Sequence, residues 1–375
     1  MPDEAPGVTE DQLATDGNNG EPPEDLLDDV RYTPRVTLRE IAAHAGVHPA
    51  TVSRALSDEK SAMVSDATRA RVVRKAAELG YEPSIPARTL RQGRSQTMGV
   101  IVADLGNPYT GQIVRGIENA LEGRGIMALI AETQDDIDRM GRVLNHLFSR
   151  SVDAIITTAA RNGTEAVLNK AYRRVPVVLA DRSLPGSDLR TVAPDDVLGA
   201  RLVAAHLVEL GHRRIALLRG PSGVSSFERR TDGFREAIEA AGAELVDLDD
   251  EAADPSIQEG RRLAGHILLL EERPTALFAE NDLMAVGALD RLSHSGVRCP
   301  EDMSIVGYDD LQLTEFTSPP LTTVRLPGYQ LGRFAAEMAV SLSEDETIEV
   351  TDLTLSPSLV VRGSSAPVGG YPPED

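Results

Sequence analysis

Apolar residues near the N-terminus recur at helical spacing in three short blocks. The segment 36–56, VTLREIAAHAGVHPATVSRAL, gives two such blocks on either side of Gly46, where a sharp turn favours a residue that tolerates positive φ. The apolar positions are Leu38, Ile41, Ala42, Ala45, Val52, Ala55 and Leu56. A third block begins after Ser65, a good N-cap, and ends at Gly80. The pattern predicts a small all-α domain, residues 35–82, whose first two helices form a helix-turn-helix.

From Thr97 onward the hydrophobic pattern changes, because apolar runs of strand length alternate with amphipathic helical segments. The runs are 98–105, 126–132, 152–158, 175–181, 214–220, 275–281 and 303–310. The helical segments between them include 111–125, 138–150, 199–211, 230–242 and 282–296. This alternation is typical of parallel sheets covered by helices. About 270 residues exceed one doubly wound domain, so we expect two lobes with a ligand cleft at their strand ends.

The net charge of −21 changes the picture only when it is divided along the chain. Residues 1–34 hold ten acids and one base, and we expect an acidic disordered tail there. Residues 35–95 hold eleven Lys or Arg and six Asp or Glu, whereas the remainder carries a net charge of −17. Only the helix-turn-helix segment is basic, which indicates that this one domain meets DNA phosphates.

Other compositional features narrow the function. The single Cys299 excludes an internal disulfide and suits a reducing cytoplasm. We find neither a signal peptide nor an apolar run long enough to cross a membrane, so we expect no membrane partner. Enzyme motifs are absent, including GxGxxG after a strand, the P-loop, GxSxG and HExxH, and we expect no metal and no cofactor. A free-standing solute-binding protein is disfavoured because it needs a signal peptide and lacks a DNA-binding domain.

Taken together, several motifs resemble the LacI/GalR (lac-repressor) family of bacterial transcription regulators. Besides the segment 36–56, they include MGVIVADLGNPY, VPVVLADR, HLVELGHRRIALLRGP, ENDLMAVGAL and MSIVGYDDLQLTEFTSPPLTTVR. The resemblance covers about residues 36–363. It implies a helix-turn-helix headpiece, a hinge helix in 83–96, and an α/β two-lobed core like periplasmic binding proteins in 97–363. We expect 364–375 to be a flexible tail.

The resemblance implies DNA contacts in the headpiece. Pro49 and Ala50 stand where the family reads operator identity, and both are restricted to apolar contacts such as a thymine methyl. Arg54 can fork onto guanine O6 and N7. Further expected contacts, mainly to phosphates, involve Thr37, His48, Thr51 and Ser53. His48 replaces a small hydroxyl residue, which leaves the helix N-cap open to question.

The segment IPARTLRQ resembles the family's hinge helix. It is shorter than the ~12 residues needed for independent helix stability, so we expect it to order only on DNA beside a partner hinge. By resemblance, Leu90 wedges into a minor-groove base step while Arg88 and Arg91 contact the backbone. The alternative is a flexible linker.

The resemblance also implies an effector site at strand ends. The expected effector-binding residues are Asp104, Asn107, Tyr109, Asp181, Phe227, Arg230, Asn281 and Asp309. Carboxylates and amides that converge there can bind vicinal hydroxyls, so a sugar or sugar derivative is the leading effector. We expect Asp282 to cap the following helix instead. A nucleobase, a nucleoside or a regulatory phosphoprotein stays open, since Trp is absent and aromatic residues make up only 3% of the chain.

The resemblance further implies a regulator of transcription that binds palindromic double-stranded DNA as a homodimer. The C-terminal SSAPVGGYPPED has no heptads for a tetramer. Repression is the commoner behaviour in the family, but the sequence does not decide between repressor and activator.

Overall fold

A computed structural model describes residues 36–57, 63–81, 94–248, 250–345 and 350–369. The chain divides between Ser84 and Ile85 into two compact units, each described by itself below. The predicted acidic tail and the predicted hinge contacts of Arg88, Leu90 and Arg91 lie outside the described residues.

The N-terminal unit is a three-helix domain. Its helices are α1 (Leu38–Ala45), α2 (Pro49–Ala55) and α3 (Asp66–Glu78). Gly46 ends α1 with φ 64°, so the expected positive-φ turn is confirmed. Ile41, Val52 and Val72 contribute one fully buried side chain from each helix to a common core. The helix-turn-helix prediction is therefore confirmed at the level of the fold.

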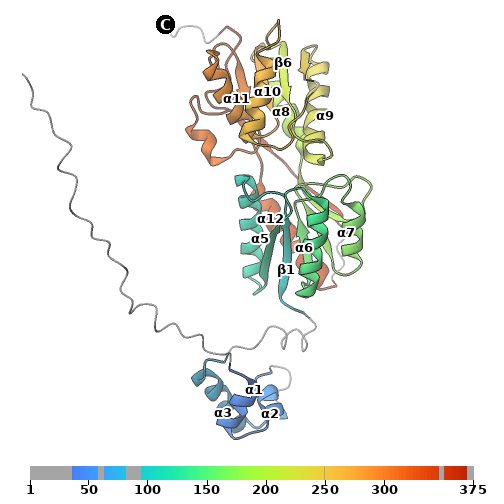
Figure 1. Cartoon of the computed structure of the whole chain (residues 1–375), viewed down its shortest axis with the longest axis vertical. Helices are drawn as coiled ribbons and strands as arrows, with labels where there is room; N and C mark the ends of the chain where they lie inside the picture. The colour runs from blue at the N-terminus through green and yellow to red at the C-terminus, as the bar shows by residue number, and fades with distance from the viewer. Residues whose placement is uncertain (1–35, 58–62, 82–93, 249, 346–349, 370–375) are drawn as a thin grey trace, which may run out of the picture. The chain divides into compact units, whose positions relative to one another are not determined.

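The second unit contains two α/β lobes (Figure 1). The N-lobe sheet has the order β11-β5-β4-β3-β1-β2, and all its neighbouring strands are parallel. Its strands are β1 (Thr97–Val102), β2 (Met127–Glu132), β3 (Ala154–Thr157), β4 (Val177–Ala180), β5 (Arg190–Pro194) and β11 (Asp352–Leu355). Its helices are α5 (Pro108–Glu122), α6 (Ile137–Ser149), α7 (Glu165–Tyr172) and α12 (Gly328–Ser343).

The C-lobe sheet has the parallel order β7-β6-β8-β9. Its strands are β6 (Arg214–Leu218), β7 (Glu244–Asp247), β8 (Ala276–Ala279) and β9 (Ser304–Val306). Its helices are α8 (Asp196–Glu209), α9 (Ser225–Ala240), α10 (Ile257–Ile267), α11 (Asp282–His294) and the 3-10 helix η3 (Gln312–Phe316). A separate antiparallel pair joins β10 (Thr323–Arg325) to β12 (Ser358–Val360).

Each sheet is buried on both faces by helices. In β1, Val100 packs in the core that contains Ile113 of α5, whereas the next residue, Ile101, packs in the core that contains Leu144 of α6. In the C-lobe, α8 and α9 cover one face of the sheet, and α10 and α11 cover the other. Burial on both faces explains why these strands appear in the sequence as continuous apolar runs.

The chain crosses between the lobes three times. The crossings lie between β5 and α8, between β10 and α12, and between β11 and β12. Because the last two crossings bring the chain into the N-lobe and back, that lobe gains α12 and β11 from the C-terminal part of the sequence. The predicted two-lobed core with parallel sheets is confirmed.

Some elements lie outside the sequence patterns, and one boundary differs. The patterns did not include β5, β7, α7, α10, α12, or the strands after residue 320. The predicted flexible tail from residue 364 is wrong at its start, because Ser364, Ser365 and Ala366 are buried. Their backbone and hydroxyl groups bond to the C-lobe, as in the bond from Ile305 N to Ser364 O at 2.7 Å. No helix in the described parts of the chain is both long and apolar enough to span a membrane.

Candidate functional site

The start of α1 is fixed by a reciprocal capping box. Thr37 Oγ1 accepts the amide of Glu40 at 3.3 Å, and Glu40 Oε2 accepts the amide of Thr37 at 2.6 Å. The bond from the Thr37 amide, followed by that from its hydroxyl, lowers the pKa of Glu40. Thr37 therefore stabilises the first helix, while its predicted phosphate contact remains a prediction.

The recognition helix α2 is capped by a histidine ring. Nδ1 of His48 accepts the amide of Ala50 at 3.2 Å, so a ring nitrogen does the work of the expected hydroxyl group. Pro49 occupies the first helical position, where its missing amide hydrogen costs little. The open question about the N-cap is answered by this geometry.

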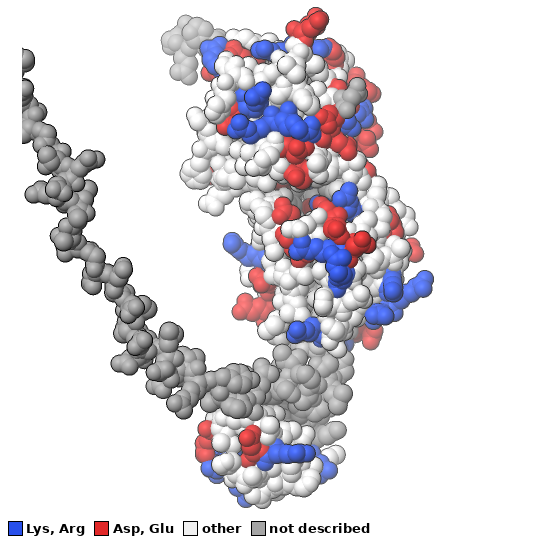
Figure 2. All heavy atoms as spheres, in the orientation of Figure 1, with Lys and Arg blue, Asp and Glu red and all other residues white. Residues whose placement is uncertain are grey.

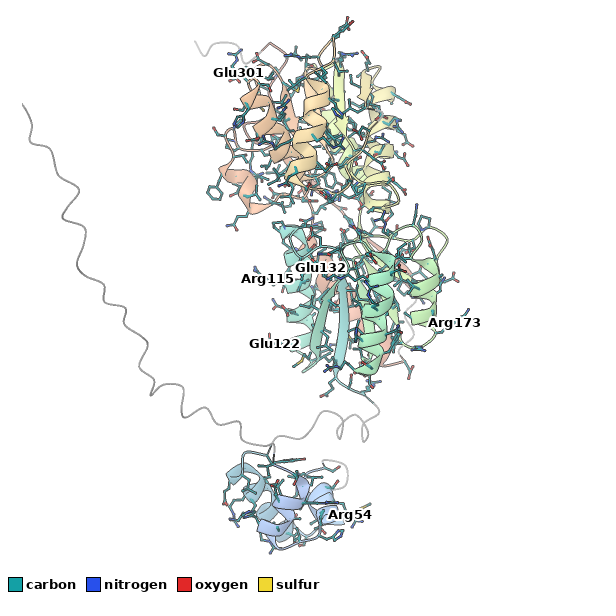
Figure 3. All side chains as sticks on the ribbon, in the orientation of Figure 1. Arg54, Arg115, Glu122, Glu132, Arg173 and Glu301 are labelled. Atoms are coloured by element: carbon teal, nitrogen blue, oxygen red, sulfur yellow. The ribbon has the colours of Figure 1, made fainter. Side chains whose placement is uncertain are left out.

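Side chains along α2 divide between core and solvent. Val52 and Ala55 are buried, whereas Ala50 and Arg54 are exposed and Thr51 and Ser53 are half-buried. Figure 3 shows Arg54 projecting away from the helices of this domain. Arg54 lies about one turn beyond Ala50 on the exposed face of α2, and its contact with a base edge remains a prediction.

A cleft of about 650 Å³ lies between the two lobes of the core. Its lining residues come from loops of both lobes and from the N-terminal parts of α5, α10 and α11. Those that carry polar side chains are Asp104, Asn107, Tyr109, Thr110, Gln134, Asp135, Thr158, Arg161, Asp181, Arg182, Asp254, Ser256 and Gln258. We call this space the interlobe cleft. Four of the eight predicted effector residues line it, namely Asp104, Asn107, Tyr109 and Asp181.

These four side chains have different local roles. Asp104 Oδ1 accepts the amide of Gly106 at 2.7 Å, and Asn107 Oδ1 caps α5 through the amide of Tyr109 at 3.0 Å. Asp181 ends β4 with φ 70°, in the left-handed region that Asp tolerates better than most residues. Tyr109 Oη and Asp181 Oδ1 are both buried, and neither makes a hydrogen bond of ordinary geometry within the described part of the chain, although the phenol lies close enough to Asp181 to lower the pKa of that carboxyl. Such atoms are candidates to receive a ligand hydroxyl or a water molecule.

The other four predicted effector residues lie in the protein interior and do not line the cleft. Arg230 Nε donates to Asp196 Oδ1 at 2.8 Å, and its Nη1 donates to the carbonyl of Glu280 at 2.7 Å. Asp309 lies 3.8 Å from Arg230 Nη1 and accepts Asn281 Nδ2 at 3.2 Å. The Arg230 guanidinium also lies 4.0 Å from the ring centroid of Tyr308 and 5.1 Å from that of Phe227. In this arrangement the four side chains contact one another and their neighbours in the interior, and their effector contacts remain a prediction.

Asp282 differs from its predicted role. The cap of α11 is Asn281, whose Oδ1 accepts the amide of Met284 at 2.9 Å. Asp282 instead accepts Thr323 Oγ1 at 2.6 Å and the amide of Leu311 at 2.8 Å. It therefore ties β10, beside a crossing segment, to α11. The prediction failed because both residues are good caps in sequence, and backbone geometry selects the first.

Five carboxyl groups lie in and around the network of Arg230, and they form what we call the acidic cluster. Its members are Asp181, Asp196, Glu280, Asp282 and Asp309. Arg230 acts on four of them, and the fifth, Asp282, acts on Asp309. Burial raises the pKa of Asp196 and Asp282 to about 6 and that of Glu280 to about 7. Burial also raises the pKa of Asp181 and Asp309, against the opposing effect of Arg230.

Several residues of this region were missed in the sequence. Gln134 and Asp135 follow β2, and Thr158 and Arg161 follow β3, so the rule that ligands bind beyond strand ends would have found them. Arg182 forms a double hydrogen bond to Asp135, at 2.6 and 3.3 Å. No sequence signal predicts that pairing, which depends on strand order. No group of three or more His, Cys, Asp or Glu side chains among the described residues is arranged to hold a metal ion.

Comparisons with known proteins agree with both units. Residues 37–84 match the family model "Bacterial regulatory proteins, lacI family", and residues 204–365 match "Periplasmic binding protein-like domain". The ribose operon repressor of Escherichia coli K12 is 32% identical over 335 residues, which cover 88% of this chain and 99% of that protein.

Two solved structures are also similar. The lac repressor dimer bound to operator and the anti-inducer ONPF is 28% identical with a TM-score of 0.80, covering 89% of this chain and all of that one. A transcriptional regulator CelR–cellobiose complex is 34% identical with a TM-score of 0.66, covering 88% of this chain and all of that one. The helix-turn-helix unit, the two-lobed core and these relatives together show that the chain belongs to the lacI family of bacterial regulatory proteins and is a DNA-binding transcriptional regulator.

Proposed function

We propose that this regulator is a repressor whose affinity for operator DNA is set by a small polyhydroxylated effector in the interlobe cleft. The observation that carries the effector part is the buried pair Tyr109 Oη and Asp181 Oδ1 at the cleft, which lie close to each other without a hydrogen bond of ordinary geometry. A hydroxyl group can donate to the carboxylate and accept from the phenol, which would satisfy both atoms at once. Asp104 and Asn107 add oxygen and amide groups in the same cavity.

The four predicted effector residues in the interior are proposed to take part in binding as well. Arg230, Asn281 and Asp309 are proposed to hold the effector once it displaces some of their mutual contacts, and Phe227 to provide apolar contact. Two relatives support a sugar: one is named a ribose operon repressor and the other is a complex with cellobiose. Sugars are rich in hydroxyl groups, which the cleft lining can bind.

In the helix-turn-helix domain, Arg54 is proposed to form hydrogen bonds to guanine, while Pro49 and Ala50 contact thymine methyl groups. Thr37, His48, Thr51 and Ser53 would contact the DNA backbone, and Leu90 with Arg88 and Arg91 would form the hinge contact. The similar lac repressor structure is a dimer on its operator, which supports a homodimer on a palindromic site here. We propose that this dimer acts in the cytoplasm and has no enzymatic activity.

Selection of genomic DNA by the full-length protein tests this function. Fragments retained by the protein should share an imperfect palindrome, and addition of a neutral sugar from a panel should change their release. A shared palindrome without any effector response would reject the effector part alone. Retention without a shared motif would reject sequence-specific repression.

A further inference from the structure

The interlobe cleft adjoins an interior that holds more negative than positive charge. Tyr109 and Asp181 line the cleft, and the charges that act most strongly on Tyr109 are those of Asp181, Asp309, Asp196 and Arg230. The acidic cluster as a whole contributes five carboxyl groups. Ionised carboxylates that are removed from water need counter-charges. The other arginines that act on the cluster form ion pairs outside it: Arg182 with Asp135, Arg219 with Asp247 and Arg229 with Asp195. Among the described residues, Arg230 is therefore the guanidinium whose ion pairs lie within the cluster.

Arg230 has no free charge to offer an incoming anion. Its Nε pairs with Asp196 at 2.8 Å, and its Nη1 lies 3.8 Å from Asp309. The side chain is 3% exposed, and the Glu280 carbonyl takes a further N–H. An anionic group placed beside it would compete with Asp196 and Asp309 for this guanidinium and add negative charge, whereas a neutral hydroxyl can accept an N–H without adding charge.

The side chains that line the cleft do not supply enough positive charge to offset the negative charge of the acidic cluster. Arg182 is neutralised by Asp135 through two hydrogen bonds. Arg161 donates to the carbonyl oxygens of Asp135 and Ser222, both at 3.4 Å, and no carboxylate pairs with it among the described residues. It shares the cavity lining with Asp104, Asp181 and Asp254. Among the described residues, Arg161 is therefore one cation without an ion pair, against Asp104 and Asp254, which have no ion pair either, and Asp181, which shares Arg230 and Arg182 with other carboxylates.

Resting on the proposed function of the cleft as the effector site, we propose that it selects neutral or amine-bearing polyols and rejects anionic ones such as sugar phosphates, uronates and nucleotides. An amine adds the positive charge that the cluster lacks, and a neutral sugar leaves the charge unchanged. A phosphate adds like charge in a region shielded from solvent, where repulsion is stronger than in water.

Matched ligand sets test this selectivity at pH 8 with the full-length protein. Melting-temperature titrations would compare D-ribose with D-ribose 5-phosphate, adenosine with its 5′-monophosphate, and D-glucose with D-glucosamine and D-glucose 6-phosphate. For any set that binds, we expect the phosphate to need at least ten-fold more ligand than its neutral or amino counterpart. Equal or tighter binding of a phosphate would overturn the proposal while leaving the cleft as the effector site.

The substitution D181N tests whether the carboxylates cause the selectivity. Asn tolerates the left-handed backbone at φ 70° and keeps an acceptor oxygen, so the fold should not suffer. Loss of one negative charge should reduce, several-fold, the ratio between the concentrations of sugar phosphate and neutral sugar that are needed. The control D188N, at an exposed position that does not line the cleft, should leave this ratio unchanged. An unchanged concentration ratio in D181N would reject the electrostatic explanation. If D181N binds neither ligand, D254N at the cleft lining supplies the same comparison.

A metabolite extract tests effectors that the three ligand sets do not include. An anion-exchange column would divide it into a retained anionic fraction and an unretained fraction. We expect the unretained fraction to raise the melting temperature, and a rise confined to the anionic fraction would overturn the proposal. If neither fraction has an effect, the small-molecule effector role itself fails and the selectivity falls with it.

Discussion

At the scale of single residues, Glu280 shows how topology sets the chemistry of a side chain. It follows β8, is fully buried, and accepts Thr231 Oγ1 at 2.5 Å and the amide of Gly220 at 2.7 Å. Burial raises its pKa from 4.5 to about 7. Between these two pH values the folded protein holds this proton and the unfolded chain does not. The stabilising contribution is therefore complete below pH 4.5 and is lost as the pH rises through 7.

The substitution E280Q should flatten this pH dependence. Gln keeps an oxygen for the Gly220 amide and an N–H for the Thr231 hydroxyl, so the fold should persist. Urea unfolding at pH 5 and pH 8 should show that the loss of stability between these values is smaller in E280Q, by up to about 3 kcal/mol. E301Q, at an exposed position labelled in Figure 3, is the control and should behave as the native protein does. If stability changed with pH in the same way in E280Q and in the native protein, the raised pKa of Glu280 would not be the cause of this pH dependence.

The candidate site was predictable from sequence only in part, and the reason is visible at individual residues. Asp104, Asn107, Tyr109 and Asp181 directly follow strands or begin a helix, so local pattern places them at the cleft. Arg230 also carries a family resemblance, but its partner Asp196 is 34 residues away and stands at a lobe crossing. Pairing of that kind depends on three-dimensional topology, which local periodicity does not encode.

At the scale of elements, glycines allow three pairs of helices to pack backbone against backbone. In the N-lobe a Cβ on Gly116 of α5 would overlap the carbonyl oxygen of Tyr329 in α12, and one on Gly332 would overlap that of Ile113. The pair α10 and α11 repeats this arrangement through Gly260 and Gly287. The third pair, α8 and α9, approaches closely at Gly233, where an added Cβ would meet the Val197 backbone.

We expect G116A to destabilise the core by about 3 kcal/mol or more, because a backbone carbonyl cannot rotate away from the added methyl group. Gly111 lies on the same helix with no atom near the position of an added Cβ, so it offers a matched control. G111A should be neutral or stabilise by up to about 1 kcal/mol through helix propensity. Chemical unfolding measures both variants. Similar stabilities for the two would show that α5 and α12 can separate without cost.

Elements were predictable where the hydrophobic pattern was strong. β1, β3 and β4 are buried on every residue and appear as unbroken apolar runs, whereas β5 has the sequence RTVAP, with an Arg and a Pro in five residues. β7 and β11 lie at sheet edges and are largely exposed, which dilutes the apolar signal. Their place in the sheets comes from pairing with β6 and β5, contacts that a local pattern does not contain.

At the scale of the whole molecule, charge separates the functions of the two units. The basic balance of residues 35–95 contrasts with the net −17 of residues 96–375. On the face of the core visible in Figure 2, acidic and basic side chains are interspersed and form no continuous basic surface. Phosphate attraction is therefore concentrated in the part of the chain that carries the helix-turn-helix.

The lobes of the core also contact each other directly, away from the chain crossings. The amide of Asn162 in the N-lobe donates to the carbonyl of Gly223 in the C-lobe at 2.8 Å. The amide of Ser183 donates to Ser225 Oγ at 2.9 Å. Both bonds require the lobes to be in contact, so they stabilise the observed arrangement, which we call closed, over any arrangement in which the lobes separate.

S225A removes one of these bonds, whereas S183A leaves it intact because Ser183 contributes its backbone amide. Loss of one such bond is worth about 1 kcal/mol, which shifts the balance between closed and open lobes about five-fold. For effector-free S225A, small-angle X-ray scattering should show a larger radius of gyration, and between about two-fold and five-fold more effector should be needed for half-saturation, depending on how much of the native protein is closed. S183A should match the native protein in both measurements. If S225A also matches it, the crossing segments alone hold the lobes together, and an effector would act on them rather than on this contact.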